Sequence, residues 1–195
     1  GDTLAIEHTL GEIVITGWDK DSVEIVAKAR PAAPGTDRNI RLYAASDLEP
    51  SVDVRKDKGA LRIRTRSLGG PWTSGGLDYA LRVPRSVNLN SVRLDQGNVK
   101  ISDIYGRIDA DITAGGMTVN NFSGPLKAAL GSGTADVEIL DLRGDDTVEI
   151  TSKQGDIVLR LQADASVKLT AEAPRGEISS DFDLGLKPPV RSLTV

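Results

Sequence analysis

Glycines recur at a fixed spacing through the middle of the chain. Gly97, Gly115 and Gly133 are 18 residues apart, and Gly106 and Gly124 lie between them, also 18 apart. Apolar residues follow Gly97 and Gly115 at offsets of two, four and seven, and follow Gly106 and Gly124 at offsets of two, four and six. Two kinds of half-unit therefore alternate, and together they repeat every 18 residues.

Each half-unit predicts one short strand followed by one tight corner. Glycine suits the corner because it adopts positive φ without a side-chain clash. Alternation along the strand directs one apolar set inward and the other residues outward. A single coil cannot bury its inward face, whereas stacked coils can. We therefore predict an all-β fold, a parallel β-solenoid with in-register strands and about 18–22 residues per coil, since the spacing lengthens after Gly133.

The chain of 195 residues fits one elongated β domain spanning 1–195. Hydrophobic residues make up 39% and aromatic residues only 4%, so the core is expected to consist of Val, Ile, Leu and Ala. Residues 1–84 contain the irregular segments 30–50 and 67–76 and are expected to be rich in β-hairpins that shield one end of the solenoid. Residues 85–195 are expected to form the glycine-cornered coils.

Stacking also predicts which outward side chains become neighbours. Residues 18 apart in the repeat should lie side by side on successive coils. Asp109 is therefore expected beside Lys127, a pair of opposite charges that would support the stack. Ser102, Asn120 and Glu138 are expected to form a second row.

Composition excludes several classes of function. The chain has no cysteine, which removes disulfides, thiolate catalysis and cysteine-based zinc sites. It has no run of 18 apolar residues, so no membrane span is expected. The net charge of −4 argues against nucleic acid as a partner. Because the chain begins at Gly1 without a start methionine, we expect that a signal or anchor has been removed.

Three segments carry a family resemblance. They are VPRSVNLNSVRLDQGNVKISDIYGRIDADITAGGMTVNNFSG from Val83, the opening GEIVITGWDKDSVEI, and the late LRLQADASVKLTAEAPRGEISSDF. They resemble a bacterial family of glycine-repeat envelope domains of unknown function that is labelled "putative adhesins". The resemblance covers most of the chain and implies an extracytoplasmic location, in the periplasm or at the cell surface. It supplies no catalytic residues and no cofactor.

A basic segment provides the first candidate binding site. Residues 28–66 contain ten Lys or Arg against five Asp or Glu, which gives this segment a charge opposite to that of the whole chain. Arg62, Arg64 and Arg66 alternate and should project from one strand face, near the basic residues Arg55, Lys56 and Lys58. They could bind an anionic polysaccharide, a lipid phosphate or an acidic envelope protein. The alternative is a solvated edge strand whose charges prevent aggregation.

Two tryptophans have different expected roles. Trp72 lies in the loop SLGGPWTSGG and could stack on a sugar or anchor a partner protein. Alternatively, Trp72 folds back over the open end of the solenoid. Trp18 lies seven residues after Gly11, the offset at which Ile104 and Phe122 occur, so we expect it to pack inside a corner.

Catalytic residues are hard to find in this sequence. His8 is the only histidine, so no histidine-based zinc site is expected, and no GxSxG motif is present. Asp109 and Asp111 share a strand face and, with acids on later coils (Asp145, Asp146 and Asp156), could form the acidic row of a polysaccharide-active β-helix enzyme. Lys127 is expected to interrupt that row, which favours a solvated face.

The sequence therefore predicts a non-catalytic, extracytoplasmic envelope module that acts as an adhesin or binds a partner. Its candidate binding residues are Arg62, Arg64, Arg66 and Trp72, and no catalytic residue, metal or cofactor is expected. The expected partner is an envelope protein or an anionic polysaccharide, and an open solenoid end could pair with a second copy to give a homodimer. The alternatives are a polysaccharide-active enzyme and a structural spacer or sensor ectodomain.

Overall fold

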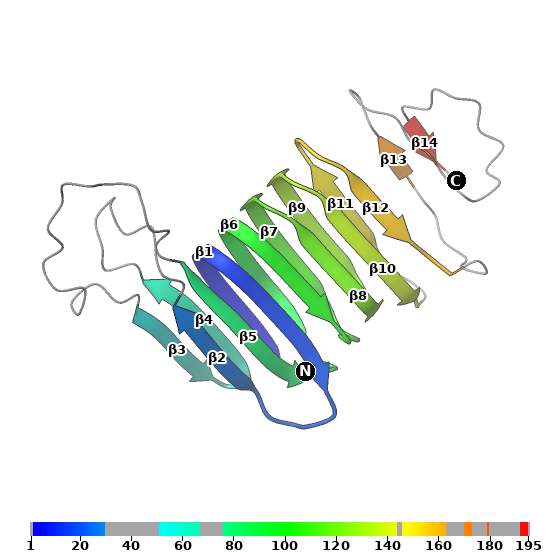
Figure 1. The fold of residues 1–195 in the computed structure, drawn as a ribbon. Helices are drawn as coiled ribbons and strands as arrows, with labels where there is room; N and C mark the ends of the chain where they lie inside the picture. The colour runs from blue at the N-terminus through cyan, green and yellow to red at the C-terminus, as the bar shows by residue number, and fades with distance from the viewer. Residues whose placement is uncertain are drawn as a thin grey trace, which may run out of the picture. The chain divides into compact units, whose positions relative to one another are not determined.

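The computed structural model describes residues 2–29, 51–66, 76–143, 146–162, 170–172, 179 and 192–194. The chain divides into two compact units, Gly1–Arg160 and Leu161–Val195 (Figure 1). In the second unit, the strands β13 (Thr170–Glu172) and β14 (Ser192–Thr194) pair antiparallel. Across these described ranges, no helix has the length and apolar character needed to cross a membrane.

The first unit is all-β, as predicted. Its strands are β1 (Thr3–Trp18), β2 (Glu24–Ala29), β3 (Ser51–Asp57), β4 (Ala60–Arg66), β5 (Leu77–Pro84), β6 (Asn88–Ser102), β7 (Ile108–Ala114), β8 (Met117–Ser123), β9 (Leu126–Ser132), β10 (Ala135–Asp141), β11 (Val148–Ser152) and β12 (Ile157–Arg160). Most strand pairs are parallel, which confirms the predicted solenoid class.

Two long strands link the two faces of the solenoid. The first half of β1 pairs with β4 and its second half pairs with β5, while β6 pairs first with β7 and then with β8. The first face therefore runs β3-β4-β1-β6-β7-β9-β11, and the second face runs β2-β5-β1-β6-β8-β10-β12 (Figure 1). Aliphatic side chains from both faces fill the core, including Ile6, Ile15 and Val119, each 0% exposed.

The register follows the predicted repeat. Val99 pairs with Met117, which pairs with Ala135, which pairs with Ile157 at the longer spacing. The predicted outward pairs Asp109–Lys127 and Ser102–Asn120 are also present. The row does not continue from Asn120 to Glu138, because the register between β8 and β10 shifts after Val137. The Glu138 carboxylate instead accepts a hydrogen bond from the backbone N–H of Asn121, at 3.4 Å.

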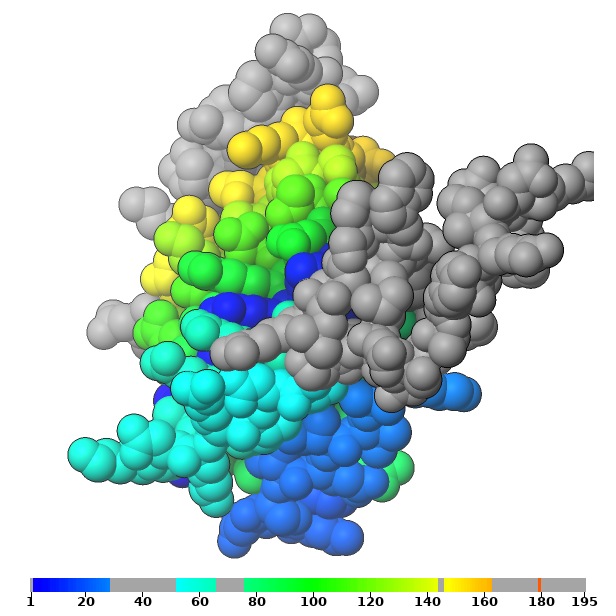
Figure 2. All heavy atoms as spheres, turned by 90° about the vertical axis from the view of Figure 1, so that its left-hand side faces the viewer, coloured from blue at the N-terminus to red at the C-terminus, as the bar shows by residue number. Residues whose placement is uncertain are grey.

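The N-terminal part differs from the expected arrangement in one respect. Residues 3–18 form a coil strand inside the parallel stack, because Gly11 aligns with Gly97 and its following residues repeat the same pattern. The predicted antiparallel strands are present on either side, as β3 with β4 and β2 with β5. They form the N-terminal end of this unit, where β3 and β4 are cyan and β2 is blue in Figure 2.

The prediction that Trp18 packs inside a corner is wrong. Ile104 and Phe122, at the same offset from their glycines, are both 0% exposed, whereas Trp18 is half-buried and reaches solvent. At the preceding position, Asp103 and Asn121 have φ of 61° and 52°. This left-handed residue breaks the alternation of the strand, so that the following residue turns inward.

β1 lacks this irregularity. Gly17 occupies the position that corresponds to Asp103 and Asn121, but its φ lies outside the left-handed region. β1 therefore stays extended and pairs with β5 up to the contact of Trp18 with Pro84. Strict alternation then leaves Trp18 on the outside of the coil, since the inward positions go to Ile15 and Gly17.

Candidate functional site

The outer surface of the β3–β4 hairpin contains the predicted basic residues. Arg62 and Arg64 are exposed on one side of β4, and Ile63 between them is fully buried, as the alternation predicted. Arg66 ends β4 opposite Ser51, but its side chain lies outside the described part of the structure. Trp72 also lies outside the described residues, so its role stays a prediction.

Two arginines of the hairpin are neutralised by carboxylates. Arg64 Nε lies 3.0 Å from Glu7 Oε2, and its terminal nitrogen donates to Glu7 Oε1 at 3.2 Å. Arg55 makes a 3.0 Å ion pair with Asp53 on the same strand. Arg64 and Arg55 are therefore only partly available to an anion.

Arg62 has a different environment. It lies directly opposite Arg55 across the hairpin and beside Ala5 of β1. Within the described ranges, Arg62 makes no ion pair with a carboxylate. Like charges that face each other across two strands are destabilising. Since Asp53 neutralises Arg55, Arg62 is the member of this pair whose charge a bound anion would neutralise.

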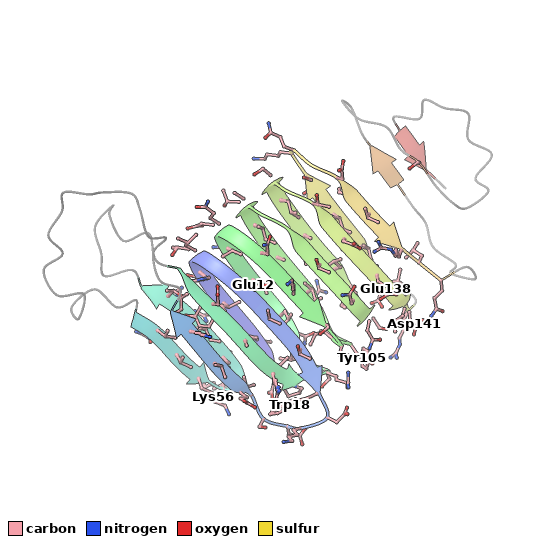
Figure 3. The ribbon with its side chains drawn as sticks, in the orientation of Figure 1. Glu12, Trp18, Lys56, Tyr105, Glu138 and Asp141 are labelled. Carbon is pink, nitrogen blue, oxygen red and sulfur yellow. The ribbon has the colours of Figure 1, made fainter. Side chains whose placement is uncertain are left out.

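The other predicted basic residues of the hairpin do not share this surface. Lys56 pairs with Leu61 and alternates to the opposite side of β3, and Lys58 lies in the turn with a φ of 44°. Both side chains are exposed, and Figure 3 shows Lys56 at the end of the first unit. We refer to the outward side chains Arg55, Arg62 and Arg64 as the arginine surface.

The two carboxylates of the Asp109–Asp111 face each lie beside a cationic side chain on a neighbouring strand. Both side chains are exposed, but Asp109 lies beside Lys127 and Asp111 lies beside Arg93. Lys127 Nζ is also 3.6 Å from a carboxylate oxygen of Glu149 on the next coil. Charges of opposite sign therefore alternate along this face, which is the arrangement of a solvated surface.

Of the later acids, Asp146 and Asp156 lie outside the strands and not on that strand face. Asp146 accepts a hydrogen bond from the backbone N–H of Arg143 at 2.9 Å, and Asp145 lies outside the described residues. Asp156 is exposed in the turn before β12. In the described part of the chain, no three His, Asp or Glu side chains are placed to hold a metal ion.

His8 is a core residue at the point where β1 changes its partner from β4 to β5. It is 4% exposed, its Nδ1 lies 2.9 Å from Thr65 Oγ1, and that hydroxyl is hydrogen-bonded to Tyr79 OH at 2.7 Å. The rings of His8 and Tyr79 meet edge to face at 5.0 Å. His8 therefore joins three strands inside the solenoid and is not presented to a substrate.

Burial lowers the pKa of His8 from its ordinary value, because the charged imidazolium is poorly solvated in the core. Smaller effects oppose this shift, from the backbone carbonyls of Leu77 and Leu10 and the carboxylates of Asp78 and Asp95. The folded state consequently favours the neutral imidazole. His8 stabilises the fold fully above its unfolded pKa of about 6.5, and this contribution is lost as the pH falls below that value.

We expect this linkage to be measurable. The free energy of unfolding should decrease as the pH falls through about 6.5, by at most about 1.4 kcal/mol per pH unit, because only the unfolded chain readily protonates His8. His8→Gln should remove this dependence at mildly acidic pH and retain the carboxylate-driven loss at lower pH. Urea unfolding at stepped pH tests the prediction. Equal slopes for the parent and the variant near pH 6 would contradict it.

A second surface was not predicted from the sequence. Trp18, Arg85 and Tyr105 lie together at one corner of the second face, which we call the aromatic corner. One local feature points to Tyr105: it follows Ile104, which the left-handed Asp103 turns inward, and Tyr105 therefore alternates outward.

The sequence model of the Toastrack DUF4097 family matches residues 85–187, more than half of the chain. The chain belongs to the Toastrack DUF4097 family. The Toastrack match begins just before β6 and extends beyond β12. The resemblance to a family of domains of unknown function is thereby confirmed.

Other comparisons are more distant. The Toastrack chain aligns with a protein from Clostridium sporogenes ATCC 15579 whose crystal structure bears the name "putative cell adhesion protein". The two chains are 10% identical with a TM-score of 0.48, and the alignment covers 83% of this chain and 92% of the other. This likeness is too distant to assign a function. No curated protein matches the Toastrack chain.

Proposed function

We propose that this Toastrack domain is a non-catalytic, extracytoplasmic binding module whose arginine surface recognises an anionic polysaccharide. The observation that carries the proposal is the position of Arg62 directly opposite Arg55, without a carboxylate partner in the described residues. Because Asp53 already pairs with Arg55, Arg62 is the guanidinium group to which a carboxylate or sulfate of a ligand would bind through charge-assisted hydrogen bonds.

The location of the arginine surface supports this role. β3 and β4 lie at the N-terminal end of the first unit, and Figure 2 shows their atoms at the front of that end. Arg64 and Glu7 form an ion pair with two contacts, which fixes the Arg64 guanidinium on the same side of β4 as that of Arg62. Arg62 and Arg64 lie two residues apart on β4 and therefore project from the same side of the strand toward a ligand.

We propose a non-catalytic role because of the positions of the two acids and the histidine that could have been catalytic. Asp109 and Asp111 have cationic neighbours in register, and His8 is held in the core by Thr65. A general base needs access to its substrate, which the buried His8 lacks. Asp109 and Asp111 are exposed, but each lies in register with a cation, Lys127 or Arg93.

The proposal is tested with polygalacturonate immobilised on a sensor surface. Arg62→Ser should weaken binding about ten-fold, which corresponds to the loss of one charge-assisted hydrogen bond. Arg107→Ser removes an equally exposed arginine from a corner near β7 and should leave binding nearly unchanged. Binding by the parent should also weaken with added salt, because exposed charges are screened.

Three results would overturn the proposal. The first is equal losses for Arg62→Ser and Arg107→Ser, which would indicate a nonspecific charge effect. The second is binding that salt does not affect. The third is shortened polygalacturonate after incubation with the parent, which would reveal an enzyme. An acidic peptide offered in place of the polysaccharide distinguishes a protein partner, since it should bind more weakly to the parent than the polysaccharide does.

A further inference from the structure

The aromatic corner contains the aromatic side chains that reach solvent among the described residues. Tyr79 and Phe122 are at most 1% exposed, whereas Tyr105 is 46% exposed and Trp18 is half-buried. Figure 3 shows Trp18 and Tyr105 at the same end of the strands. A chain with so few aromatic residues therefore presents two of them on one corner of a rigid stack.

The backbone fixes the spacing of this corner. The N–H of Arg85 donates to the carbonyl of Trp18 at 3.3 Å, and the N–H of Tyr105 donates to the carbonyl of Arg85 at 2.7 Å. β1, which ends at Trp18, and β6, which leads into the turn of Tyr105, are neighbours in the second face, so Trp18 and Tyr105 lie on adjacent levels of the solenoid, about 4.8 Å apart. Adjacent rings of a short oligosaccharide can span a separation of this size.

Arg85 lies between the two aromatic residues and is held by carboxylates. Its Nε is 2.8 Å from Asp19 Oδ1, and a terminal nitrogen is 3.1 Å from Asp103 Oδ1. The Arg85 guanidinium also lies over the Tyr105 ring, 5.6 Å from the centroid. The hydrogen bond from Arg85 lowers the pKa of Asp19, and the hydrogen bonds to Asp19 and Asp103 raise the pKa of Arg85. Asp19 and Arg85 are therefore charged and oriented at neutral pH.

Further polar groups continue this line. The side-chain amide of Asn121 donates to Asp103 Oδ1, so that an amide, two carboxylates and a guanidinium follow one another along the corner. Several of their lone pairs and N–H groups remain available to hydroxyl groups, since a carboxylate can accept about four hydrogen bonds and a guanidinium can donate five.

Trp18 is also held in place before any ligand arrives. Its indole N–H donates to the carbonyl of Ser22 at 2.8 Å. Lys20 Nζ lies 4.7 Å from the ring centroid, and the Arg82 guanidinium lies 6.0 Å from it. An aromatic ring that is already oriented loses little conformational entropy when a ligand stacks on it.

The charge of the aromatic corner points to the ligand class. Its cations Lys20, Arg82 and Arg85 are accompanied by the carboxylates Asp19, Glu24 and Asp103, and Asp21 lies in the same turn as Asp19 and Lys20. A corner without an excess of positive charge has no electrostatic attraction for a polyanion. Aromatic faces pack against apolar surface while fixed polar groups bond hydroxyls, a combination that suits uncharged sugars.

We propose that the aromatic corner binds a neutral polysaccharide, with pyranose rings stacked on Trp18 and Tyr105 and their hydroxyl groups hydrogen-bonded to Arg85, Asp19 and Asp103. This site is separate from the arginine surface and has a different ligand chemistry. The result of either binding test therefore does not decide the other proposal.

The test uses the full chain and three neutral probes, which are cellohexaose, chitohexaose and maltohexaose. Calorimetric titration should show binding of at least one hexasaccharide, and Trp18→Ala should weaken that binding about ten-fold or more, as expected for an aromatic anchor. Tyr105→Ala should weaken it several-fold. Trp18→Phe should retain more affinity than Trp18→Ala, because a ring face is kept.

Two controls separate this site from the others. Trp72→Ala removes the second tryptophan of the chain and should leave the affinity unchanged, as should Arg62→Ser. Added salt should have little effect, in contrast to polygalacturonate binding at the arginine surface. The proposal would be overturned if no hexasaccharide bound the parent. It would also be overturned if Trp18→Ala bound normally, or if Trp72→Ala lost the affinity.

Discussion

Gly115→Ala is expected to unfold the coil stack, whereas Gly116→Ala at the adjacent position is expected to be tolerated. Gly115 has a φ of 137°, a conformation that residues with a side chain rarely adopt. A Cβ atom on Gly115 would lie 1.6 Å from the carbonyl oxygen of Gly97 on the preceding coil. The clash is with backbone that is itself in the ladder, so it can be relieved only by separating the two coils.

The expected cost of Gly115→Ala exceeds about 4 kcal/mol, a large part of the 5–15 kcal/mol by which domains are stable. At Gly116, the nearest atom to an added Cβ is the Asn98 side-chain oxygen at 3.2 Å, and φ is not left-handed. That side chain can move, so Gly116→Ala should cost about 1 kcal/mol or less. Urea unfolding followed by circular dichroism measures both. Variants that differ by less than about 1 kcal/mol would contradict this explanation of the repeat.

The same contact explains how the repeat lengthens without losing its register. A Cβ on Gly133 would lie 1.9 Å from the carbonyl of Gly115, and a Cβ on Gly155 would lie 2.1 Å from the carbonyl of Gly133. The glycine column thus continues although Gly133 and Gly155 are 22 residues apart. The four additional residues lie between β10, which ends at Asp141, and β11, which begins at Val148. The chain therefore varies at the other corner, where the coils approach less closely, since a Cβ on Gly124 would lie 2.9 Å from the carbonyl oxygen of Gly106.

The glycine spacing was sufficient to predict the coils, because a corner glycine and an inward apolar pair are properties of each coil alone. The pairing of β1 inside the stack could also be predicted from Gly11, whose following residues have the same offsets as those of Gly97. What the offsets did not predict was the direction of the seventh residue. That direction depends on the backbone conformation of the sixth residue after the glycine, which is left-handed at Asp103 and Asn121. Asp and Asn are among the few non-glycine residues that adopt this conformation.

The candidate surfaces could also be predicted from the sequence only in part. The alternation of β4 predicted that Arg62 and Arg64 share one side, which is a local property. The difference between them is not local, because Glu7, the partner of Arg64, comes from β1 at the start of the chain. The aromatic corner likewise requires three segments that are distant in the sequence, which are the end of β1, the turn after β5 and the turn after β6. Neighbours of this kind become visible only when the register between coils is known.

Phe122→Ala and Trp18→Ala are expected to differ widely in stability, although both residues lie seven positions after a corner glycine. Phe122 is 0% exposed and packs in the core where Ile139 of β10 is its partner in register. Its truncation leaves a cavity and should cost about 3–5 kcal/mol. Trp18 is half-buried on the outside of the solenoid, so its truncation should cost about 1 kcal/mol.

This difference has one structural cause, which is the left-handed Asn121 before Phe122 and the extended Gly17 before Trp18. Thermal and urea unfolding of the two variants under the same conditions measure the effect. Losses of equal size would show that Trp18 packs in the core like Phe122, and Trp18 would then be unavailable to a sugar. A small loss for Trp18→Ala leaves the fold intact in the variant. A weakened affinity for a hexasaccharide can then be attributed to the missing indole ring and not to unfolding.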